Sequence, residues 1–266
     1  MKILAITNQK GGVGKTTTCV NLAASMASLG KKVLLIDLDP QGNASTGSGI
    51  DKAHLKHSIY HVLIGEKTLS EVITTSEKGG FDIAPANREL AGAEVDLVNE
   101  LARETRLKVA IAKLLNVKGA AVYDVILLDC PPALNLVTVN ALTAANAVMI
   151  PMQCEYYALE GLSDLVSTIK KVRARLNPTL EIEGLLRTLF DNRNMLANQV
   201  SAQLISHFGD KVYKTIIPRN IRLAEAPSYG VPVLSYDKAS KGAQAYMDLA
   251  LEIDLKETIS KEKKNG

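Results

Sequence analysis

The sequence has few cysteines, no long apolar run and almost no net charge, and each scarcity excludes a class of protein. Its three cysteines, Cys19, Cys130 and Cys154, are odd in number and widely separated, which argues against a disulfide framework or a CxxC metal site. The longest apolar stretches, such as Val33–Ile36 and Val125–Leu128, are far shorter than the roughly 20 residues of a membrane-spanning helix. We therefore expect no membrane partner and a reducing, cytoplasmic compartment.

The remaining composition is that of a folded protein. The chain has 266 residues, of which 47% are hydrophobic and 22% charged, enough apolar material to bury a sizeable core. Its mean hydropathy of +0.07 excludes a disordered chain, which needs low hydrophobicity and high net charge. The formal net charge is only +3, so the total predicts no partner and only the distribution of the charges is informative.

Seven apolar runs have the length of strands and alternate with segments of helical periodicity. Because most runs are continuous rather than alternating, they favour a mostly parallel sheet that is buried on both faces. The predicted strands are Ile3–Thr7, Val33–Asp37, Phe81–Ala84, Val125–Asp129, Ala147–Pro151, Leu185–Phe190 and Thr215–Ile217. The predicted helices between them are Thr16–Leu29, Asn87–Leu115, Glu160–Leu176 and Asn198–Phe208. This order indicates an α/β doubly wound fold whose sheet is flanked by helices.

The C-terminal part of the chain carries one more helical pattern and then turns polar. We expect a single domain over residues 1–255, closed by a helix at Gln244–Leu255 that packs on the core. Residues 256–266 are polar and rich in lysine, so we expect them to form a frayed or disordered tail.

A glycine-rich segment follows the first predicted strand and leads into the first predicted helix. It reads Lys10-Gly11-Gly12-Val13-Gly14-Lys15-Thr16-Thr17, with Gln9 where the strict GxxxxGK[ST] pattern has its first glycine. Glycines let backbone amides turn around phosphate oxygens, and a helix N-terminus adds positive partial charge. In such a P-loop Lys15 reaches the β- and γ-phosphates and the Thr16 hydroxyl binds Mg²⁺. The alternative, a turn without a ligand, fits this order of elements poorly.

Acidic residues end two of the predicted strands. Asp37 and Asp39 are two residues apart, so both side chains can point into one crevice at the carboxyl end of the sheet. Asp129 ends an apolar strand in the Walker B manner, and we expect it to hold Mg²⁺ through a water, together with Thr16. A pair of solvated loop acids is the alternative for Asp37 and Asp39. Cys130 has apolar neighbours and prolines beside it, so we interpret it as a packing residue rather than a nucleophile.

Lys10 is an additional cation five residues before Lys15. With it, the glycine-rich segment resembles the KGGxGKT[ST] signature of the ParA/MinD family of deviant Walker A ATPases, and most closely chromosome-partitioning ParA (Soj). The resemblance extends to about Leu251. It includes five further stretches: Asp37–Asn43, Gln153–Gly161, Ile217–Arg222, Glu225–Ser228 and Ser240–Ala243.

The resemblance implies a reaction and a role for several residues. It implies hydrolysis of ATP with Mg²⁺ in a homodimer that forms when ATP is bound, with Lys10 reaching the nucleotide of the partner. Asp39 would orient the attacking water, and Asp37 would have a supporting role linked to Mg²⁺. Pro218 and Asn220 match positions that contact adenine in the family.

The resemblance also implies macromolecular partners. Arg193 and Arg222 match arginines that ParA proteins use for non-specific DNA binding, so a nucleoid-associated location is expected. A ParB-type centromere-binding protein would stimulate hydrolysis. The charges agree, because Lys170–Lys241 contains twelve basic and six acidic side chains, a surplus of +6 against −3 for the rest of the chain. Such a surplus suits DNA phosphates, although solvated surface charges are the alternative.

Several alternatives remain at this point. A MinD-like membrane protein would need an amphipathic basic helix where Gln244–Leu255 looks core-packed, and a nitrogenase-type reductase would need paired cysteines. A non-enzymatic scaffold would leave Lys10 and Asp39 idle, which an ATPase assay tests. The sequence does not distinguish a chromosome from a plasmid or another cargo. Arg187 and the segment Asn116–Ala121 depart from the family pattern, and the sequence assigns neither a role.

Overall fold

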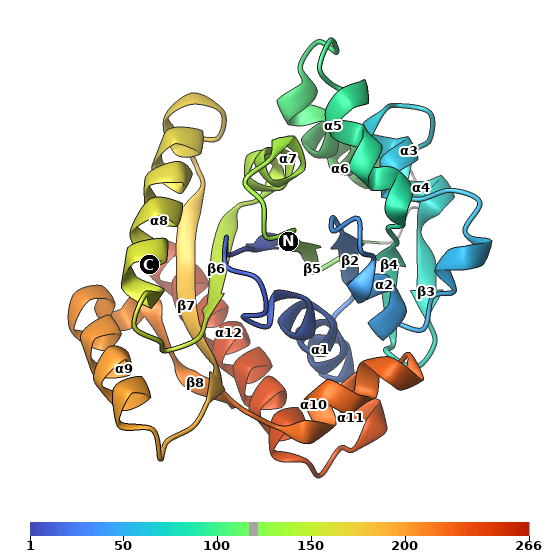
Figure 1. Cartoon of the computed structure of the whole chain (residues 1–266). Coiled ribbons are helices and arrows are strands. Elements are labelled where there is room, and N and C mark those ends of the chain that lie inside the picture. Colours follow the sequence, from blue (N-terminus) through green and yellow to red (C-terminus); the bar gives the residue numbers. More distant parts are fainter. Residues whose placement is uncertain (117–121, 266) are drawn as a thin grey trace.

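The fold is built around one sheet of eight strands (Figure 1). The computed structural model describes residues 1–116 and 122–265; of the segment Asn116–Ala121, residues 117–121 lie outside the described residues. The strand order is β3-β4-β2-β5-β1-β6-β7-β8. All neighbours are parallel except the pair β3 and β4. The predicted α/β fold with a mostly parallel sheet is therefore confirmed.

The elements of regular structure follow one another along the chain. The strands are β1 (Lys2–Ile6), β2 (Val33–Asp37), β3 (Thr74–Ser76), β4 (Phe81–Ala84), β5 (Val125–Asp129), β6 (Ala147–Met152), β7 (Glu181–Phe190) and β8 (Val212–Pro218). The helices are α1 (Lys15–Ser28), α2 (Asn43–Gly47), α3 (Ile59–Leu63), α4 (Leu69–Val72), α5 (Ala93–Asp96), α6 (Arg106–Leu115), α7 (Leu136–Ala144), α8 (Ala158–Arg175), α9 (Met195–Phe208), α10 (Ile221–Glu225), α11 (Val233–Tyr236) and α12 (Lys241–Asn265).

Apolar layers cover both faces of the sheet. Along β1, Ile3 and Ala5 pack in the layer that contains α6, α7, α8 and α9, while Leu4 and Ile6 pack in the layer that contains α1 and α12. Successive side chains of a strand point to opposite faces, so a strand buried on both sides must be apolar throughout. This explains the continuous apolar runs in the sequence.

Two predictions about individual elements were wrong, and one edge strand was missed. The helix predicted over Asn87–Leu115 is broken into short 3₁₀ and α segments, of which α6 (Arg106–Leu115) is the longest. Ala102 adopts a left-handed conformation (φ 54°) just before it, and the Asn140 side chain of α7 accepts a hydrogen bond from Leu107 N at 3.1 Å. A distant side chain thus caps α6, which no local periodicity reveals.

The other two differences concern an edge strand of the sheet and the C-terminal end of the chain. The edge strand β3 (Thr74–Ser76) was not predicted because it is short and polar. The polar segment after residue 255, expected to fray, continues helix α12 as far as Asn265.

No helix in the described part of the chain combines the length and the apolar character needed to cross a membrane.

Candidate functional site

The glycine-rich segment lies between β1 and α1, at the carboxyl end of the central strand. Gly14 precedes α1 with φ 83°, in the left-handed region that glycine tolerates. Among the described residues, no side chain caps the start of α1, so its first amides remain available to a ligand. A helix N-terminus with available amides attracts anions such as phosphate.

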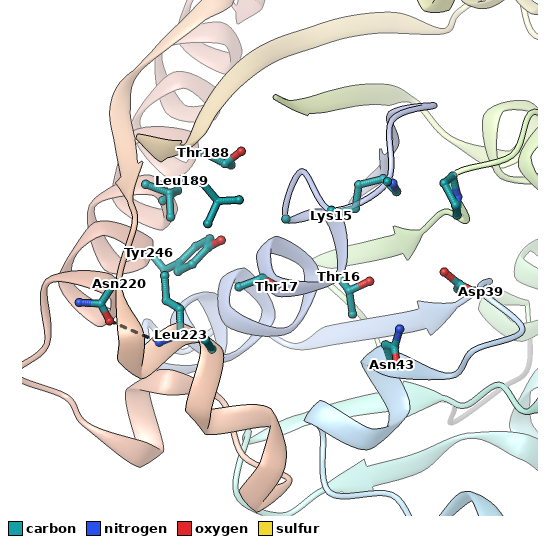
Figure 2. A pocket seen from close by; sticks show the side chains of 16 residues that line it. Lys15, Thr16, Thr17, Asp39, Asn43, Thr188, Leu189, Asn220, Leu223 and Tyr246 are labelled. Carbon is teal, nitrogen blue, oxygen red and sulfur yellow. Dashed lines mark hydrogen bonds between the residues drawn. The ribbon is translucent and has the colours of Figure 1, made fainter. Parts of the chain in front are cut away.

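A cavity of about 340 Å³ opens at this segment (Figure 2). Its polar end is lined by Gly11, Gly12, Gly14, Lys15, Thr16 and Thr17. Asp39 and Asn43 line a second, acidic side, and Leu189, Ile217, Asn220, Leu223 and Tyr246 line a more apolar end. Figure 2 shows Thr16 and Asp39 on one side of the P-loop, with Leu189 and Tyr246 on the other. The cavity therefore offers donors for phosphates at one end and apolar walls for a flat group at the other.

Lys15 and Lys10 have different surroundings. Lys15 is buried and its Nζ donates a hydrogen bond to the Lys10 carbonyl at 3.0 Å. Burial lowers the pKa of Lys15, while the nearby charge of Asp129 acts in the opposite direction. The Lys10 ammonium is exposed and forms an ion pair with Glu155, which precedes α8. The two lysines therefore present one cation in the cavity wall and one that is exposed on the surface.

The strand-ending acids Asp37 and Asp129 are neighbours in the sheet register and are fully buried. The Asp37 carboxylate accepts hydrogen bonds from Asp39 N (3.1 Å), Ser45 N (2.8 Å) and Ser45 Oγ (2.7 Å). Burial raises the pKa of Asp37 to about 6, against the effect of these hydrogen bonds. Asp37 thereby ties the turn that carries Asp39 to the start of α2.

Asp129 is less completely satisfied. Its Oδ1 accepts a weak hydrogen bond from Cys19 Sγ at 3.4 Å, and its buried Oδ2 has no hydrogen-bond partner among the residues that the structure describes. Burial and then the charge of Asp37 raise the pKa of Asp129 to about 8, whereas the nearby Thr16 hydroxyl and Cys19 thiol act to lower it. An unpartnered buried carboxylate oxygen is costly, and a cation beside it would remove the cost.

The residues present fit a magnesium ion. Mg²⁺ usually takes one or two carboxylates, several waters and substrate phosphates rather than an all-protein cage. Within residues 1–116 and 122–265, no three His, Cys, Asp or Glu side chains are gathered to hold a metal ion. The hydroxyl of Thr16 and the unpartnered oxygen of Asp129 suit the small number of protein ligands that Mg²⁺ takes. Phosphate and water would supply the remaining ligands.

The structure brings most of the expected nucleotide residues together, but Lys10, Val13 and Pro218 do not line the cavity. Asn220 lines the cavity, but Pro218, at the end of β8, does not, although its neighbour Ile217 does. The side chain of Asn220 also caps α10, since its Oδ1 accepts hydrogen bonds from Arg222 N (3.0 Å) and Leu223 N (3.3 Å).

Among the residues of the cavity wall that the sequence did not indicate are Asn43, Thr188, Leu189 and Tyr246. Thr188 donates a hydrogen bond to the carbonyl of Val13 in the P-loop at 2.7 Å, and Leu189 follows it with φ 50°. The hydroxyl of Tyr246, on α12, is hydrogen-bonded to the hydroxyl of Thr18 at 3.1 Å. Asn43 stands in a stretch already noted for its resemblance, but the other three are too far from the P-loop in sequence to leave a local signal.

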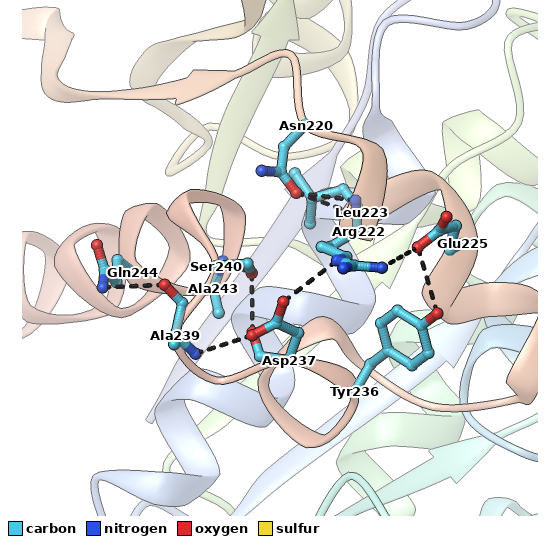
Figure 3. Close-up of polar contacts among 10 residues, drawn as sticks. All are labelled: Asn220, Arg222, Leu223, Glu225, Tyr236, Asp237, Ala239, Ser240, Ala243 and Gln244. Carbon is cyan, nitrogen blue, oxygen red and sulfur yellow. Dashed lines mark hydrogen bonds and ion pairs between the residues drawn. The ribbon is translucent and has the colours of Figure 1, made fainter.

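The two arginines expected to bind DNA are both paired with acids. Arg193 is 86% exposed at its side chain and forms a two-point pair with Asp191, at 2.9 and 2.8 Å. Arg222 pairs with Glu225 at 2.9 Å and with Asp237 at 3.2 Å (Figure 3). Neither arginine lines the nucleotide cavity. Any anion that binds Arg222 therefore competes with two carboxylates.

Comparison with known proteins agrees with this geometry. The family model described as AAA domain matches residues 1–182. The sporulation initiation inhibitor protein Soj of Bacillus subtilis is 53% identical over 252 residues, 95% of this chain and 98% of that protein. The chromosome partitioning protein ParA of Caulobacter vibrioides is 49% identical over 253 residues, 95% of this chain and 94% of that protein.

Solved structures give the same grouping. A Mycobacterium smegmatis protein described as cobyrinic acid a,c-diamide synthase, with bound ATP analog and magnesium, has a TM-score of 0.80 and 37% identity, covering 94% of this chain and 93% of that one. A putative plasmid partition protein of Borrelia burgdorferi bound to AMPPNP has a TM-score of 0.79 and 27% identity, covering 96% and 99%. With its P-loop and its two buried strand-ending acids, the chain belongs to the ParA/Soj family of P-loop ATPases.

Proposed function

We propose that this ATPase partitions DNA. In this proposal it hydrolyses ATP with Mg²⁺ in a nucleotide-sandwich dimer, binds DNA non-specifically, and segregates a chromosome or plasmid with a ParB-type partner. The observation that carries the proposal is the convergence of Lys15, Thr16 and Asp39 on one cavity, in a chain whose named relatives include chromosome-partitioning proteins.

Phosphoryl transfer to water depends mainly on positioning and on neutralising charge. Lys15 binds the β- and γ-phosphates together with the amides of residues 11–17, and Asp39 orients the water for in-line attack. Thr16 directly and Asp129 through a water would hold Mg²⁺, which would supply positive charge against the phosphates. Asp37 supports this arrangement indirectly, because its three hydrogen bonds fix the turn of Asp39 and the start of α2.

The base of the nucleotide lies at the apolar end of the cavity in this proposal. Asn220 lines that end beside Ile217 and Leu223, and Pro218 adjoins it along β8. Apolar walls with one or two polar side chains are typical of sites for flat cofactor rings. An Asn220→Ala protein should bind ATP more weakly and inorganic tripolyphosphate, which has no base, as well as wild type does.

Dimer formation is supported by the exposed position of Lys10. In a single copy, the Lys10 ammonium pairs with Glu155, and both side chains are about half exposed, at 48% and 52%. Such a surface ion pair contributes only about 0–1 kcal/mol, so it is readily exchanged for the phosphates of a partner's nucleotide. The adjacent Tyr156 and Tyr157 are also exposed and offer apolar area to a second copy.

DNA binding would use Arg193, Arg222 and the surrounding basic surplus of residues 170–241. Contacts of this kind neutralise phosphates without reading sequence. A dimer doubles the basic surface, so ATP would control DNA affinity through dimerisation and place the protein on the nucleoid. Arg222→Glu should lose retention on DNA while its ATPase activity in the absence of DNA remains unchanged.

The decisive experiment measures ATP hydrolysis with and without DNA and a candidate ParB-type protein. We expect stimulation by both ligands together that exceeds the sum of their separate effects. Phosphate release without any synergy, but with normal basal turnover, would favour another cargo and another partner.

A further inference from the structure

Arg187 is a buried cation inside the sheet. It stands on β7, only 6% exposed, and has no carboxylate within ion-pair distance among the residues that the structure describes. Its Nη2 donates hydrogen bonds to the carbonyls of Tyr213 (2.7 Å) and Lys214 (3.2 Å), and its Nη1 donates to Ser201 Oγ (2.9 Å). A buried arginine bound mainly to backbone carbonyls must hold that backbone in a particular form.

The backbone it holds is a bulge in β8. Leu185 is paired with Val212 and Arg187 with Ile216, so β8 advances by four residues while β7 advances by two. The regular ladder is therefore interrupted between Val212 and Ile216, and buried peptide groups in such a segment need partners. Bulges of this kind occur beside active sites, where they redirect side chains.

Glu252 of α12 holds the same bulge through its amides. Its two carboxylate oxygens accept hydrogen bonds from Lys214 N and Thr215 N, each at 2.9 Å. Arg187 thus binds the carbonyls and Glu252 the amides of one short segment, with the peptide groups between opposite charges. We call these two side chains the bulge clamp.

Both members of the bulge clamp remain charged. Burial lowers the pKa of Arg187, and Cys154 and then the charge of Glu252 act in the opposite direction. Burial alone would raise the pKa of Glu252, but the hydrogen bonds from Thr215 and Lys214 keep it below its usual value. Hydrogen bonds from ionised groups are stronger than neutral ones, which makes the clamp suited to fixing the segment.

The bulge clamp lies directly before both walls of the apolar end of the cavity. After Arg187, β7 advances by three residues to Phe190 while β8 advances by two from Ile216 to Pro218. The extra residue on β7 accompanies the left-handed Leu189, which lines the cavity next to Thr188. On β8 the residues that follow Ile216 include Ile217 and Asn220, which also line the cavity. The two irregularities together decide how Leu189 faces Ile217.

We propose that Arg187 and Glu252 are positioning residues that fix the walls of the adenine end of the nucleotide cavity by clamping the β8 bulge. The proposal rests on the placement of the base given above. The clamp touches no phosphate-binding residue directly, so its effect belongs to recognition of the base and ribose rather than to the chemical step.

The test compares two ligands on the same variants. Arg187→Met keeps most of the side-chain volume but removes the donors, and Glu252→Gln replaces one acceptor oxygen by a donor group. We expect each to raise the Kd for Mg²⁺–ATP about tenfold, with the Kd for Mg²⁺–tripolyphosphate within about twofold of wild type. The KM for ATP should rise similarly while kcat at saturation stays within about threefold, the pattern of lost uniform binding. Arg187→Lys should be intermediate, because an ammonium cannot form the fork.

Ser201→Ala is the matched control, because it removes the third partner of Arg187 without touching β8. It should leave both Kd values unchanged. If Arg187→Met or Glu252→Gln bound both ATP and tripolyphosphate with a lower stoichiometry, the two residues would serve folding alone. That result would overturn the proposal. If Arg187→Met does not fold, Glu252→Gln decides the matter by the same measurements.

Failure of the clamp and failure of the base placement give different results. Normal ATP affinity in Arg187→Met and Glu252→Gln, with weakened ATP affinity in Asn220→Ala, refutes the clamp alone. Normal ATP affinity in Asn220→Ala refutes the placement of the base on which the clamp depends.

Discussion

The nucleotide cavity assigns different environments to side chains that are chemically alike. Lys15 is buried with a lowered pKa, whereas Lys10 is exposed and paired with Glu155. Asp129 is fully buried, whereas Asp39 is partly exposed at the cavity wall, its Oδ1 accepting a hydrogen bond from Gln41 N at 2.9 Å. Single substitutions should therefore separate binding from hydrolysis.

Lys15→Ala should abolish measurable ATP binding, because a buried cation beside the phosphates makes charge-assisted hydrogen bonds that no neighbour replaces. Asp39→Ala should bind ATP as wild type does but lose turnover by about 100-fold or more, since only the water loses its orienting group. Calorimetric titration with a non-hydrolysable ATP analogue and a phosphate-release assay measure the two effects. Equal ATP affinity in Lys15→Ala and wild type would contradict the first half.

The ion pairs of Arg222 lead to a second prediction at this scale, which depends on the proposed DNA binding. Glu225→Gln should raise DNA affinity about threefold, the order of one exposed ion pair, because the guanidinium no longer has to leave that carboxylate. Asp248→Asn removes the same charge from an exposed acid of α12 that forms no ion pair within the described residues, so it is the control for net charge. Fluorescence anisotropy with labelled duplex DNA measures both. An equal gain from the two variants would attribute the effect to net charge alone.

At the scale of elements, short turns at the carboxyl ends of strands hold the site in place. The turn from β2 to α2 is closed by a hydrogen bond from Gly42 N to the Asp39 carbonyl at 2.8 Å. Gly42 has φ 61°, and a Cβ at this position would lie 2.6 Å from the Ala86 carbonyl oxygen. The backbone conformation and the space both require glycine here.

Gly42→Ala should lower the free energy of unfolding by about 2 kcal/mol or more, since it combines left-handed strain with a backbone clash. It should also lower turnover, because the shifted turn carries Asp39. Gly161→Ala is the control: this residue lies inside α8 with nothing within 4 Å of the added Cβ, so the same exchange should gain up to about 1 kcal/mol in helix propensity. Urea unfolding measures both, and similar losses in the two variants would refute the explanation for Gly42.

At the scale of the whole molecule, ATP sites and basic surface are separate regions of one chain. The nucleotide cavity lies at the carboxyl end of the central strands, while the exposed Arg193 and Arg222 lie outside it. Their cooperation in the proposed function therefore depends on assembly, which brings two cavities and two basic surfaces together.

Asp39→Ala should accumulate as a dimer in the presence of ATP and Mg²⁺, because hydrolysis no longer ends the assembled state. The double variant Lys10→Ala/Asp39→Ala should stay monomeric under the same conditions, since the cation proposed to bridge the two copies is missing. Light scattering coupled to size-exclusion chromatography distinguishes the two masses. A dimer of unchanged stability in the double variant would remove Lys10 from the interface.

The sequence by itself determined the chemistry of the phosphate end and the class of the fold. The residues from Lys10 to Thr17 are contiguous, and their backbone conformation depends on local glycines and on the helix that follows. The local sequence is therefore enough to predict this loop. Asp37 and Asp129 were also readable, because each ends an apolar run and parallel strands place such ends at one edge of the sheet.

Only the tertiary structure decided most of the opposite end of the cavity, apart from Asn220, together with the cap of α6 and the partners of Arg187. Thr188 reaches Val13 across 175 residues of chain and Tyr246 reaches Thr18 across 228, and neither leaves a pattern in its own neighbourhood. The bulge of β8 depends on register against β7, which is set by packing over the whole sheet rather than by local preference. Contacts of this kind arise only when distant strands and helices are brought together, and so the end of the cavity where we propose that the base binds depends on the complete fold.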